Sequence, residues 1–247
     1  MTEHRFLCIA HRGASSYAPE NTFAAFDRAL ELGVSHVELD VHFSRDGHIV
    51  VIHDDTLDRT TDASGAVADR TLTELRRLDA GSWFGPGYAG EPIRSLAEIF
   101  EEYKGRLYFH VEIKARAAGL ASRTADMIRA HGLTDDVTII SFWKPWLEET
   151  RDYAPELTTG WLVPLEMGSQ WDDSIIEQAL ELGLDQVCPR ADITTAELVS
   201  TLHRHGFVVR CHSVHSEELM RRVVACGADG MTINFPDKLL EYIESVN

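Results

Sequence analysis

The sequence predicts an α/β fold, a TIM (β/α)8 barrel with a small insertion after its second strand, on three observations. Short apolar runs alternate with amphipathic segments, which is the pattern of βα units. The length of 247 residues suits one such barrel, which usually needs about 250. Acidic, basic and imidazole side chains, which can bind ligands or transfer protons, recur where the apolar runs end. Barrel enzymes carry their active sites at the carboxyl ends of their strands. We therefore expect one domain over residues 1–247.

The elements can be placed in order from the apolar runs and the helix signals. The first expected strand covers residues 6–10. Asn21 is expected to cap the helix that follows, and Gly33 to end it. The second strand covers residues 37–41. Further strands are expected at 107–113, 137–141, 158–163, 185–188, 207–211 and 230–233, and helices at about 95–104, 119–131, 145–153, 172–182, 194–205, 215–226 and after Pro236.

The second expected strand carries two acidic residues. Glu38 and Asp40 are two positions apart and project from one face, where two carboxylates repel each other unless a cation or a proton lies between them. Asp46-Gly47 predicts a hairpin turn after this strand. A two-residue turn would place Asp40 opposite His53, and a turn one residue longer at each end would place Glu38 there. In either register we expect His53 on the carboxylate face. The alternative is a solvated hairpin with scattered charges.

An insertion interrupts the pattern after this hairpin. The connection between the second strand and its helix far exceeds the roughly 2–6 residues of an ordinary βα loop, and we place the insertion at about 54–94. It should contain a short helical piece near 72–78 and an aromatic, glycine-rich segment at 81–88. Such insertions lie at the face that carries the chemistry, so this one could wall or cover the site. The alternative is a decorative flap in which Trp83 and Phe84 form a miniature core.

Candidate site residues stand at the ends of several expected strands. They are His11 and Arg12 after the first strand, Glu112 and Lys114 after the third barrel strand, His212 after the seventh and Asn234 after the eighth. Three carboxylates that converge on one mouth, those of Glu38, Asp40 and Glu112, suit a hard divalent cation bound through oxygen. The sequence therefore predicts a Mg²⁺ or Ca²⁺ site.

The basic and imidazole side chains complete this prediction. Arg12 and Lys114 could bind a phosphate that also contacts the cation. His11 and His53 would then flank one anionic centre, where one imidazole takes a proton from the attacking hydroxyl and the other gives one to the leaving alkoxide.

Each of these residues also has a structural interpretation. The tripeptide at 11–13 could be a solvated turn, and Glu112 and Lys114 could form an ion pair inside the barrel. Glu20 is expected to be a solvated neighbour of the helix cap. Structural or surface roles are assigned to His42, His48 and His110. Four aromatic residues that follow the fourth and fifth barrel strands could receive the leaving alcohol or a lipid chain, or could cover helix–strand joints: Phe142, Trp143, Trp146 and Trp161.

Charge and cysteine usage restrict the partners and the compartment. A net charge of −17 argues against nucleic acid and anionic membranes, which select basic patches. No run reaches the roughly 18 apolar residues of a membrane span, and from the first residues we expect no signal peptide. The four cysteines are widely spaced, so we expect reduced thiols and a cytoplasmic protein. A homo-oligomer is possible, and stable membrane association is not expected.

The combined motifs resemble the glycerophosphodiester phosphodiesterases. The resemblance covers roughly residues 6 to 243, in the order of that family. The matching segments are His11-Arg12-Gly13, Pro19-Glu20-Asn21-Thr22, Glu38-Leu39-Asp40-Val41, the Asp46-Gly47 turn, His53-Asp54, Arg59-Thr60-Thr61, Val111-Glu112-Ile113-Lys114, Gly227-Ala228-Asp229-Gly230 and Asn234-Phe235-Pro236.

This resemblance implies a TIM barrel with a bound divalent metal that hydrolyses glycerophosphodiesters to glycerol 3-phosphate and an alcohol. It implies that the 2-hydroxyl of the substrate glycerol attacks phosphorus first, giving a cyclic phosphate that water then opens. The residues carried over are His11 and His53 as the acid/base pair, Glu38, Asp40 and Glu112 as metal ligands, and Arg12 and Lys114 as phosphate contacts.

The chain departs from the family pattern after the seventh barrel strand. Where the family commonly has a Trp-Thr-Val-Asn-like segment, this chain reads His212-Ser213-Val214-His215. The aromatic platform beside the substrate is lost or replaced by imidazole, so we count His212 among the substrate- or phosphate-binding candidates. Two alternatives remain: a lysophospholipase D-type reaction on lysophospholipids, and a barrel that binds phosphodiesters without turnover.

Overall fold

Eight parallel strands close into a barrel in the computed structural model, which describes residues 6–166 and 170–246. The barrel closes where β1 pairs with both β2 and β9, and β3 adds an antiparallel arm to β2 outside it. This arrangement confirms the predicted TIM barrel. The strands are β1 Leu7–His11, β2 His36–Phe43, β3 Ile49–Val51, β4 Tyr108–Ile113, β5 Val137–Ser141, β6 Thr158–Leu162, β7 Gln186–Cys188, β8 Val208–Val214 and β9 Gly230–Ile233.

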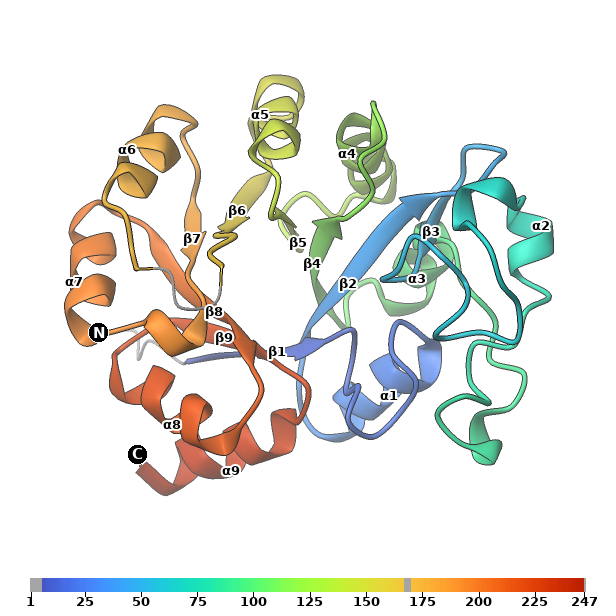
Figure 1. Cartoon of the computed structure of the whole chain (residues 1–247), viewed down its shortest axis with the longest axis horizontal. Coiled ribbons are helices and arrows are strands. Elements are labelled where there is room, and N and C mark those ends of the chain that lie inside the picture. The colour runs from blue at the N-terminus through green and yellow to red at the C-terminus, as the bar shows by residue number, and fades with distance from the viewer. Residues whose placement is uncertain (1–5, 167–169, 247) are drawn as a thin grey trace.

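Helices surround the strands (Figure 1). They are α1 Phe23–Glu31, α2 Leu72–Leu75, α3 Leu96–Tyr103, α4 Leu120–His131, α5 Lys144–Tyr153, α6 Ser174–Glu181, α7 Ala196–Arg204, α8 Glu217–Ala225 and α9 Pro236–Val246, with short 3-10 turns η1 Val67–Asp69, η2 Pro86–Tyr88 and η3 Ala191–Ile193. All the expected barrel strands and helices are present, and their ends differ from the predictions by a few residues. In the part of the chain that the structure describes, none of the helices has the length and hydropathy that crossing a membrane requires.

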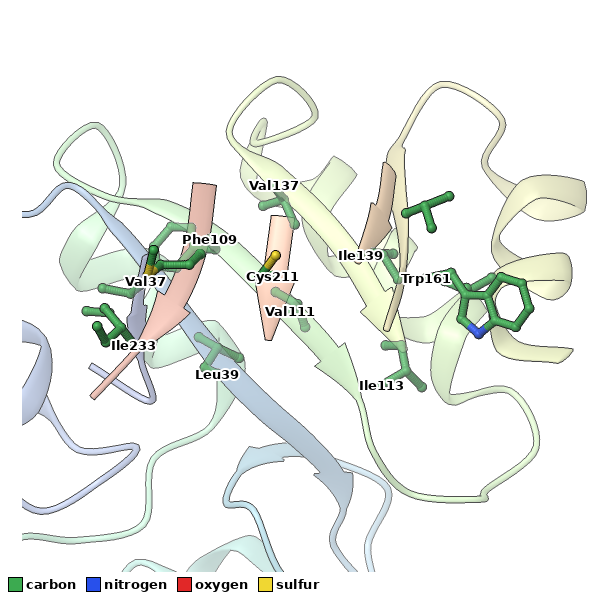
Figure 2. Close-up of a cluster of buried hydrophobic side chains, with 14 of the residues drawn as sticks. Val37, Leu39, Phe109, Val111, Ile113, Val137, Ile139, Trp161, Cys211 and Ile233 are labelled. Atoms are coloured by element: carbon green, nitrogen blue, oxygen red, sulfur yellow. The ribbon is translucent and has the colours of Figure 1, made fainter. Parts of the chain in front are cut away.

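The main core lies between the strands and the surrounding helices. Alternate strand residues point outward into it, among them the fully buried Leu39, Val111 and Ile139 (Figure 2). The intervening residues must point into the barrel, because successive side chains on a strand alternate. The parallel register pairs Glu38 with His110 and Asp40 with Glu112, so the acidic residues predicted on two separate strands lie on neighbouring strands at matching heights.

The hairpin register corrects both predicted alternatives. Val41 pairs with Val51, and the amide of Ser44 donates to the carbonyl of His48, which leaves a three-residue loop that ends in Gly47. Gly47 has a φ of 78°, which glycine adopts without strain. Continuing the register gives Leu39 as the residue opposite His53, between the two predicted partners. His53 therefore reaches the site from beyond the end of β3.

The insertion packs on an aliphatic core of its own. Eight buried residues form this cluster: Val50, Ile52, Leu57, Val67, Leu72, Leu75, Ala80 and Ile93. Trp83 is 41% exposed and contacts Phe84 edge to face, so these two rings are not the core of the insertion. The insertion follows β3 beside α1 and β2 at the right of Figure 1, in cyan to green.

The first helix is capped one residue later than predicted. The side chain of Thr22 accepts a hydrogen bond from the amide of Ala25, whereas Asn21 has a φ of 60° and points elsewhere. Asparagine is a somewhat better N-cap than threonine, so the residue preference favoured Asn21, and only the backbone conformation places the cap at Thr22. The choice leaves the Asn21 amide available to the site.

Candidate active site

Three buried carboxylates meet at the carboxyl ends of β2 and β4. Glu38, Asp40 and Glu112 are 2%, 0% and 5% exposed. Each offers an oxygen within 4.8 Å of the other two. The structure therefore brings together the three predicted metal ligands.

Crowding and burial make this cluster electrostatically costly without a cation. Burial and the neighbouring carboxylates of Asp40 and Glu112 raise the pKa of Glu38 well above its usual range. Burial and Asp40 raise the pKa of Glu112 to about 7, against the opposing effect of Lys114. Two of the three acids are thus held toward their neutral forms when only protein groups surround them.

Asp40 is the acid of the three whose pKa is lowered, although Lys114 also pairs with Glu112, with 2.9 Å between Lys114 Nζ and Glu112 Oε1. Burial alone would raise its pKa, but Arg12 and Lys114 outweigh burial and lower it. Arg12 Nε lies 3.2 Å and Lys114 Nζ 3.8 Å from the carboxylate of Asp40. The side-chain amide of Asn21 donates to the same carboxylate at 3.0 Å. The prediction of Asn21 as a helix cap therefore missed its role as a fixed donor to a candidate ligand.

The free oxygens of the cluster fit a hard cation. Glu38 Oε1 and Asp40 Oδ1 are buried and have no hydrogen-bond partner among the residues that the structure describes. Buried polar atoms normally have partners, and a carboxylate oxygen without a donor is suited to a metal. No histidine or cysteine joins the three carboxylates in the metal-ligand cluster found in residues 6–166 and 170–246, so its donors are those of a Mg²⁺ or Ca²⁺ site.

His11 presents one ring nitrogen to this cluster. Its Nδ1 lies 2.6 Å from Asn234 Oδ1, a carbonyl oxygen that can only accept, so Nδ1 carries the proton. Its Nε2 lies 3.8 Å from Glu38 Oε2. About a third of the side chain is exposed, at 31%, yet desolvation and then the charge of Arg12 lower the pKa of His11 to about 4. His11 is therefore a neutral imidazole with a free acceptor nitrogen.

His53 is held in the same tautomer by a different partner. Its Nδ1 lies 2.5 Å from Asp54 Oδ1, which leaves Nε2 as its free nitrogen. Asp54 is fixed in turn by two hydrogen bonds from Arg59, of 2.7 and 3.0 Å. The two histidines thus have matched tautomers, one supported by an amide and the other by a carboxylate.

A chain of ion pairs joins the insertion to the first barrel loop. Arg59 donates to both oxygens of Glu20, each at 2.8 Å, and Arg12 donates to the same carboxylate at 2.8 Å. The Glu20 side chain is 11% exposed, so the prediction of a solvated residue was wrong. One of its guanidinium partners, Arg59, lies 39 residues away along the chain, too far for a local pattern to reveal. This chain orients Arg12 and, through Asp54, His53.

These side chains line one cavity of about 310 Å³ at the barrel mouth. Six of the predicted catalytic, phosphate-binding and metal-ligating residues form part of its wall: His11, Arg12, Glu38, His53, Glu112 and Lys114. His212 also lines the cavity, inside β8 rather than after the strand as predicted. Asp40 lies beneath the lining as a partner of Arg12 and Lys114.

The remaining cavity wall comes from β5, β6, β8 and β9 and from residues that directly follow β5, β8 and β9. Phe142 belongs to it, whereas Trp161 points outward into the main core (Figure 2). Trp143 is 41% exposed and lies under the guanidinium of Arg116. Of the four aromatic residues considered for the leaving alcohol, Phe142 is thus the one that the structure places in the cavity.

Backbone strain is concentrated at this site. Three residues other than glycine have a positive φ within residues 6–166 and 170–246: Arg12 at 56°, Asn21 at 60° and Ser213 at 58°. Two of them line the cavity, and the third binds Asp40. Residues held in the left-handed region cluster at functional sites because the surrounding structure must stabilise them. The strain therefore marks the same location as the carboxylates and histidines.

Comparisons with known proteins agree with this geometry. The sequence model of the glycerophosphoryl diester phosphodiesterase family matches residues 11–238. The chain is 36% identical over 241 residues to the glycerophosphodiester phosphodiesterase of Caldanaerobacter subterraneus subsp. tengcongensis, with 96% of this chain and 97% of that protein covered. It is 29% identical over 253 residues to a Bacillus subtilis enzyme of the same name, with 96% and 86% covered.

Solved structures show the same relationship. A phosphodiesterase from Oleispira antarctica, in complex with its product sn-glycerol-3-phosphate, superposes with a TM-score of 0.88 at 30% identity, with 96% of each chain covered. The glycerophosphodiester phosphodiesterase of Agrobacterium tumefaciens superposes with a TM-score of 0.82 at 26% identity, with 96% and 99% covered. The chain therefore belongs to the glycerophosphoryl diester phosphodiesterase family and is an enzyme of that class.

Proposed function

We propose that this enzyme hydrolyses glycerophosphodiesters to sn-glycerol 3-phosphate and a free alcohol by two-histidine catalysis at a divalent cation. The observation that carries the proposal is that His11 and His53, each held through Nδ1 with Nε2 left free, line one cavity together with Glu38 and Glu112 of the carboxylate cluster. The product bound to the Oleispira antarctica relative supports the same product here.

Glu38, Asp40 and Glu112 would hold the cation, Mg²⁺ or Ca²⁺. When bound, it would neutralise the phosphate charge and polarise the phosphorus–oxygen bonds. Arg12 and Lys114 would bind the remaining phosphate oxygens, since both reach the cavity with charged donors. Arg12 and Lys114 also pair with the carboxylates, so each would contact both the phosphate and an acidic side chain.

The histidines would move the two protons of each step. A free Nε2 on one ring accepts the proton of the attacking hydroxyl as its oxygen bonds to phosphorus. The other ring, protonated on Nε2, gives its proton to the alkoxide as the bond from phosphorus to the alcohol oxygen breaks. Attack by the glycerol 2-hydroxyl would give a cyclic phosphate, and water would then open it with the histidine roles exchanged.

We also propose that the chain acts as one domain, because Asp54 and Arg59 of the insertion support His53, which lines a cavity built otherwise on the barrel strands. The substrate would be a small soluble diester. The spacing of the cysteines favours action in the cytoplasm.

Release of sn-glycerol 3-phosphate from glycerophosphocholine and glycerophosphoethanolamine, with Mg²⁺, with Ca²⁺ and after chelation, tests the proposal. Metal-dependent release is expected from both diesters. Release of choline from lysophosphatidylcholine but not from glycerophosphocholine would favour the lysophospholipase D alternative. Absence of turnover with every metal, together with tight binding of the diester, would favour a binding barrel.

A further inference from the structure

The segment that departs most from the family pattern forms a rigid part of the cavity wall. His212, Ser213, Val214 and His215 all line the cavity. The backbone amide of His212 donates to the carbonyl of Pro189 at 3.1 Å, and His215 Nδ1 lies 3.0 Å from the carbonyl oxygen of Ser213. The pairing of β8 with β9 shifts register between Cys211 and Val214, and Ser213 takes its positive φ there. This bulge directs the exposed Ser213 toward the cavity.

The two ring nitrogens of His212 are both engaged. Nε2 lies 3.3 Å from the backbone carbonyl oxygen of Val163, and Nδ1 lies 2.9 Å from the hydroxyl oxygen of Ser213. Burial, followed by the charges of Arg190 and Arg210, lowers the pKa of His212 to about 4 despite the hydrogen bond to Val163. The ring is therefore neutral at physiological pH and carries one proton. Both nitrogens are occupied, so His212 has none left for a phosphate oxygen.

These contacts fix the direction of the Ser213 hydroxyl. A backbone carbonyl can only accept, so the proton of His212 is on Nε2 and points to Val163. Nδ1 is then an acceptor, and the hydroxyl of Ser213 must donate to it. The oxygen of Ser213 keeps its lone pairs for the cavity but has no proton left to donate. Ser213 is thus a hydrogen-bond acceptor only.

The wall around this oxygen suits a short carbon chain that ends in a hydroxyl. Ile140, Phe142 and Leu162 supply apolar side chains to the same cavity, and the Phe142 ring packs edge to face on the ring of His212, 5.2 Å between centroids. The 2-hydroxyl of the substrate glycerol is committed to the histidines and phosphorus in the proposed reaction. The terminal hydroxyl, one carbon further from phosphorus, is the group of the glycerol half that remains to be recognised.

We propose that Ser213 accepts a hydrogen bond from the terminal glycerol hydroxyl, and that His212 positions it by accepting the Ser213 proton. The enzyme then selects glycerophosphodiesters with a free terminal hydroxyl and rejects those in which this oxygen is acylated or alkylated, because such an oxygen has no proton to donate. Lysophospholipids with a 1-acyl chain fall in the rejected class. This inference rests on the proposed diesterase function and specifies its substrate.

The test compares kcat/KM for glycerophosphocholine and for its 1-deoxy-1-fluoro analogue, in which fluorine replaces the hydroxyl at similar size but cannot donate. The native enzyme should favour the hydroxyl substrate by about tenfold or more, equivalent to about 1.4 kcal/mol. Ser213→Ala and Ser213→Gly should both bring this ratio close to one. Agreement between the two variants separates loss of the hydroxyl from relief of backbone strain, because glycine accepts the positive φ and alanine does not.

His212→Phe tests the positioning role. Without an acceptor at Nδ1, the Ser213 hydroxyl can rotate and donate. The ratio of kcat/KM for the 1-O-methyl ether of glycerophosphocholine to kcat/KM for glycerophosphocholine should therefore be higher in the variant than in the native enzyme. Ser200→Ala, an exposed serine on α7, is the matched control and should leave both ratios unchanged.

Equal kcat/KM for the hydroxyl and fluoro substrates in the native enzyme would overturn the inference while leaving the diesterase function intact. An unchanged ratio in Ser213→Gly would also overturn it. If neither substrate were hydrolysed, the proposed function itself would fail. The two failures are therefore distinguishable in one set of assays.

Discussion

Replacing Glu112 with glutamine should have opposite effects on the protein with and without metal. In the metal-free protein the variant removes one of three carboxylates whose oxygens lie within 4.8 Å, so mutual repulsion falls. The metal-free variant should be at least as stable as the native protein. With metal, the same change removes a charged ligand, so the stabilisation that metal provides should fall.

The expected shifts follow from binding linkage. At a metal concentration 100 times Kd, a ligand that binds only the native state stabilises it by about 2.7 kcal/mol. For a protein of this size, 1 kcal/mol corresponds to about 2–4 °C, so the native protein should gain about 5–10 °C in Tm. If loss of Glu112 weakens binding about 100-fold, the gain at the same concentration falls to about 0.4 kcal/mol, or about 1–2 °C.

Differential scanning calorimetry in EDTA and in excess Mg²⁺ or Ca²⁺ measures both effects. Glu102→Gln is the control, because Glu102 is a half-exposed acid on α3 that pairs with Arg106, away from the carboxylate cluster. It should reproduce the native metal shift. A full metal shift in Glu112→Gln would remove Glu112 from the ligand set, and a metal-free variant much less stable than the native protein would contradict the repulsion argument.

Three further predictions concern the histidines, their support and pH. His11→Ala or His53→Ala should lower kcat by about 10²–10⁴ with the circular dichroism spectrum retained, and near-native turnover would refute the acid/base assignment. Asp54→Asn should lower kcat by about 10² or more without weakening metal affinity in calorimetric titration, because the wrong His53 tautomer then becomes available. In EDTA, the urea midpoint of the native protein should fall as pH rises from about 5 to 8, because the native state keeps the Glu112 proton up to a pKa of about 7 whereas the unfolded chain releases it near 4.5. The midpoint of Glu112→Gln should depend less on pH over this range. A midpoint that rises with pH in both proteins would contradict the raised pKa of Glu112.

The amino-acid sequence was enough to predict the fold and the chemical content of the site. Alternating apolar runs and amphipathic segments are local patterns, and eight of them with 247 residues leave few closed arrangements other than the observed barrel. The carboxyl ends of parallel strands meet at one mouth, so polar residues at those ends had to converge. That rule correctly predicted that His11, Glu38 and Glu112 share one cavity.

The orientation of these residues follows from the tertiary structure, because it depends on partners far apart in sequence. Glu20 is fixed by guanidinium groups from the first loop and the insertion, and Asn21 was free to bind Asp40 only because its neighbour capped the helix. The hairpin register differed by one step from each prediction because loop length depends on backbone conformation at Gly47, which composition does not fix.

The acceptor role proposed for Ser213 likewise depends partly on the sequence and partly on the tertiary structure. The sequence contains the departure at 212–215 and leaves substrate choice open there. The direction of the hydroxyl depends on the carbonyl of Val163, which lies 49 residues from His212 along the chain and reaches it because β6, β7 and β8 lie side by side in the sheet. A strand pattern can place a donor or an acceptor at a site, but the proton positions follow from contacts that only the folded chain makes.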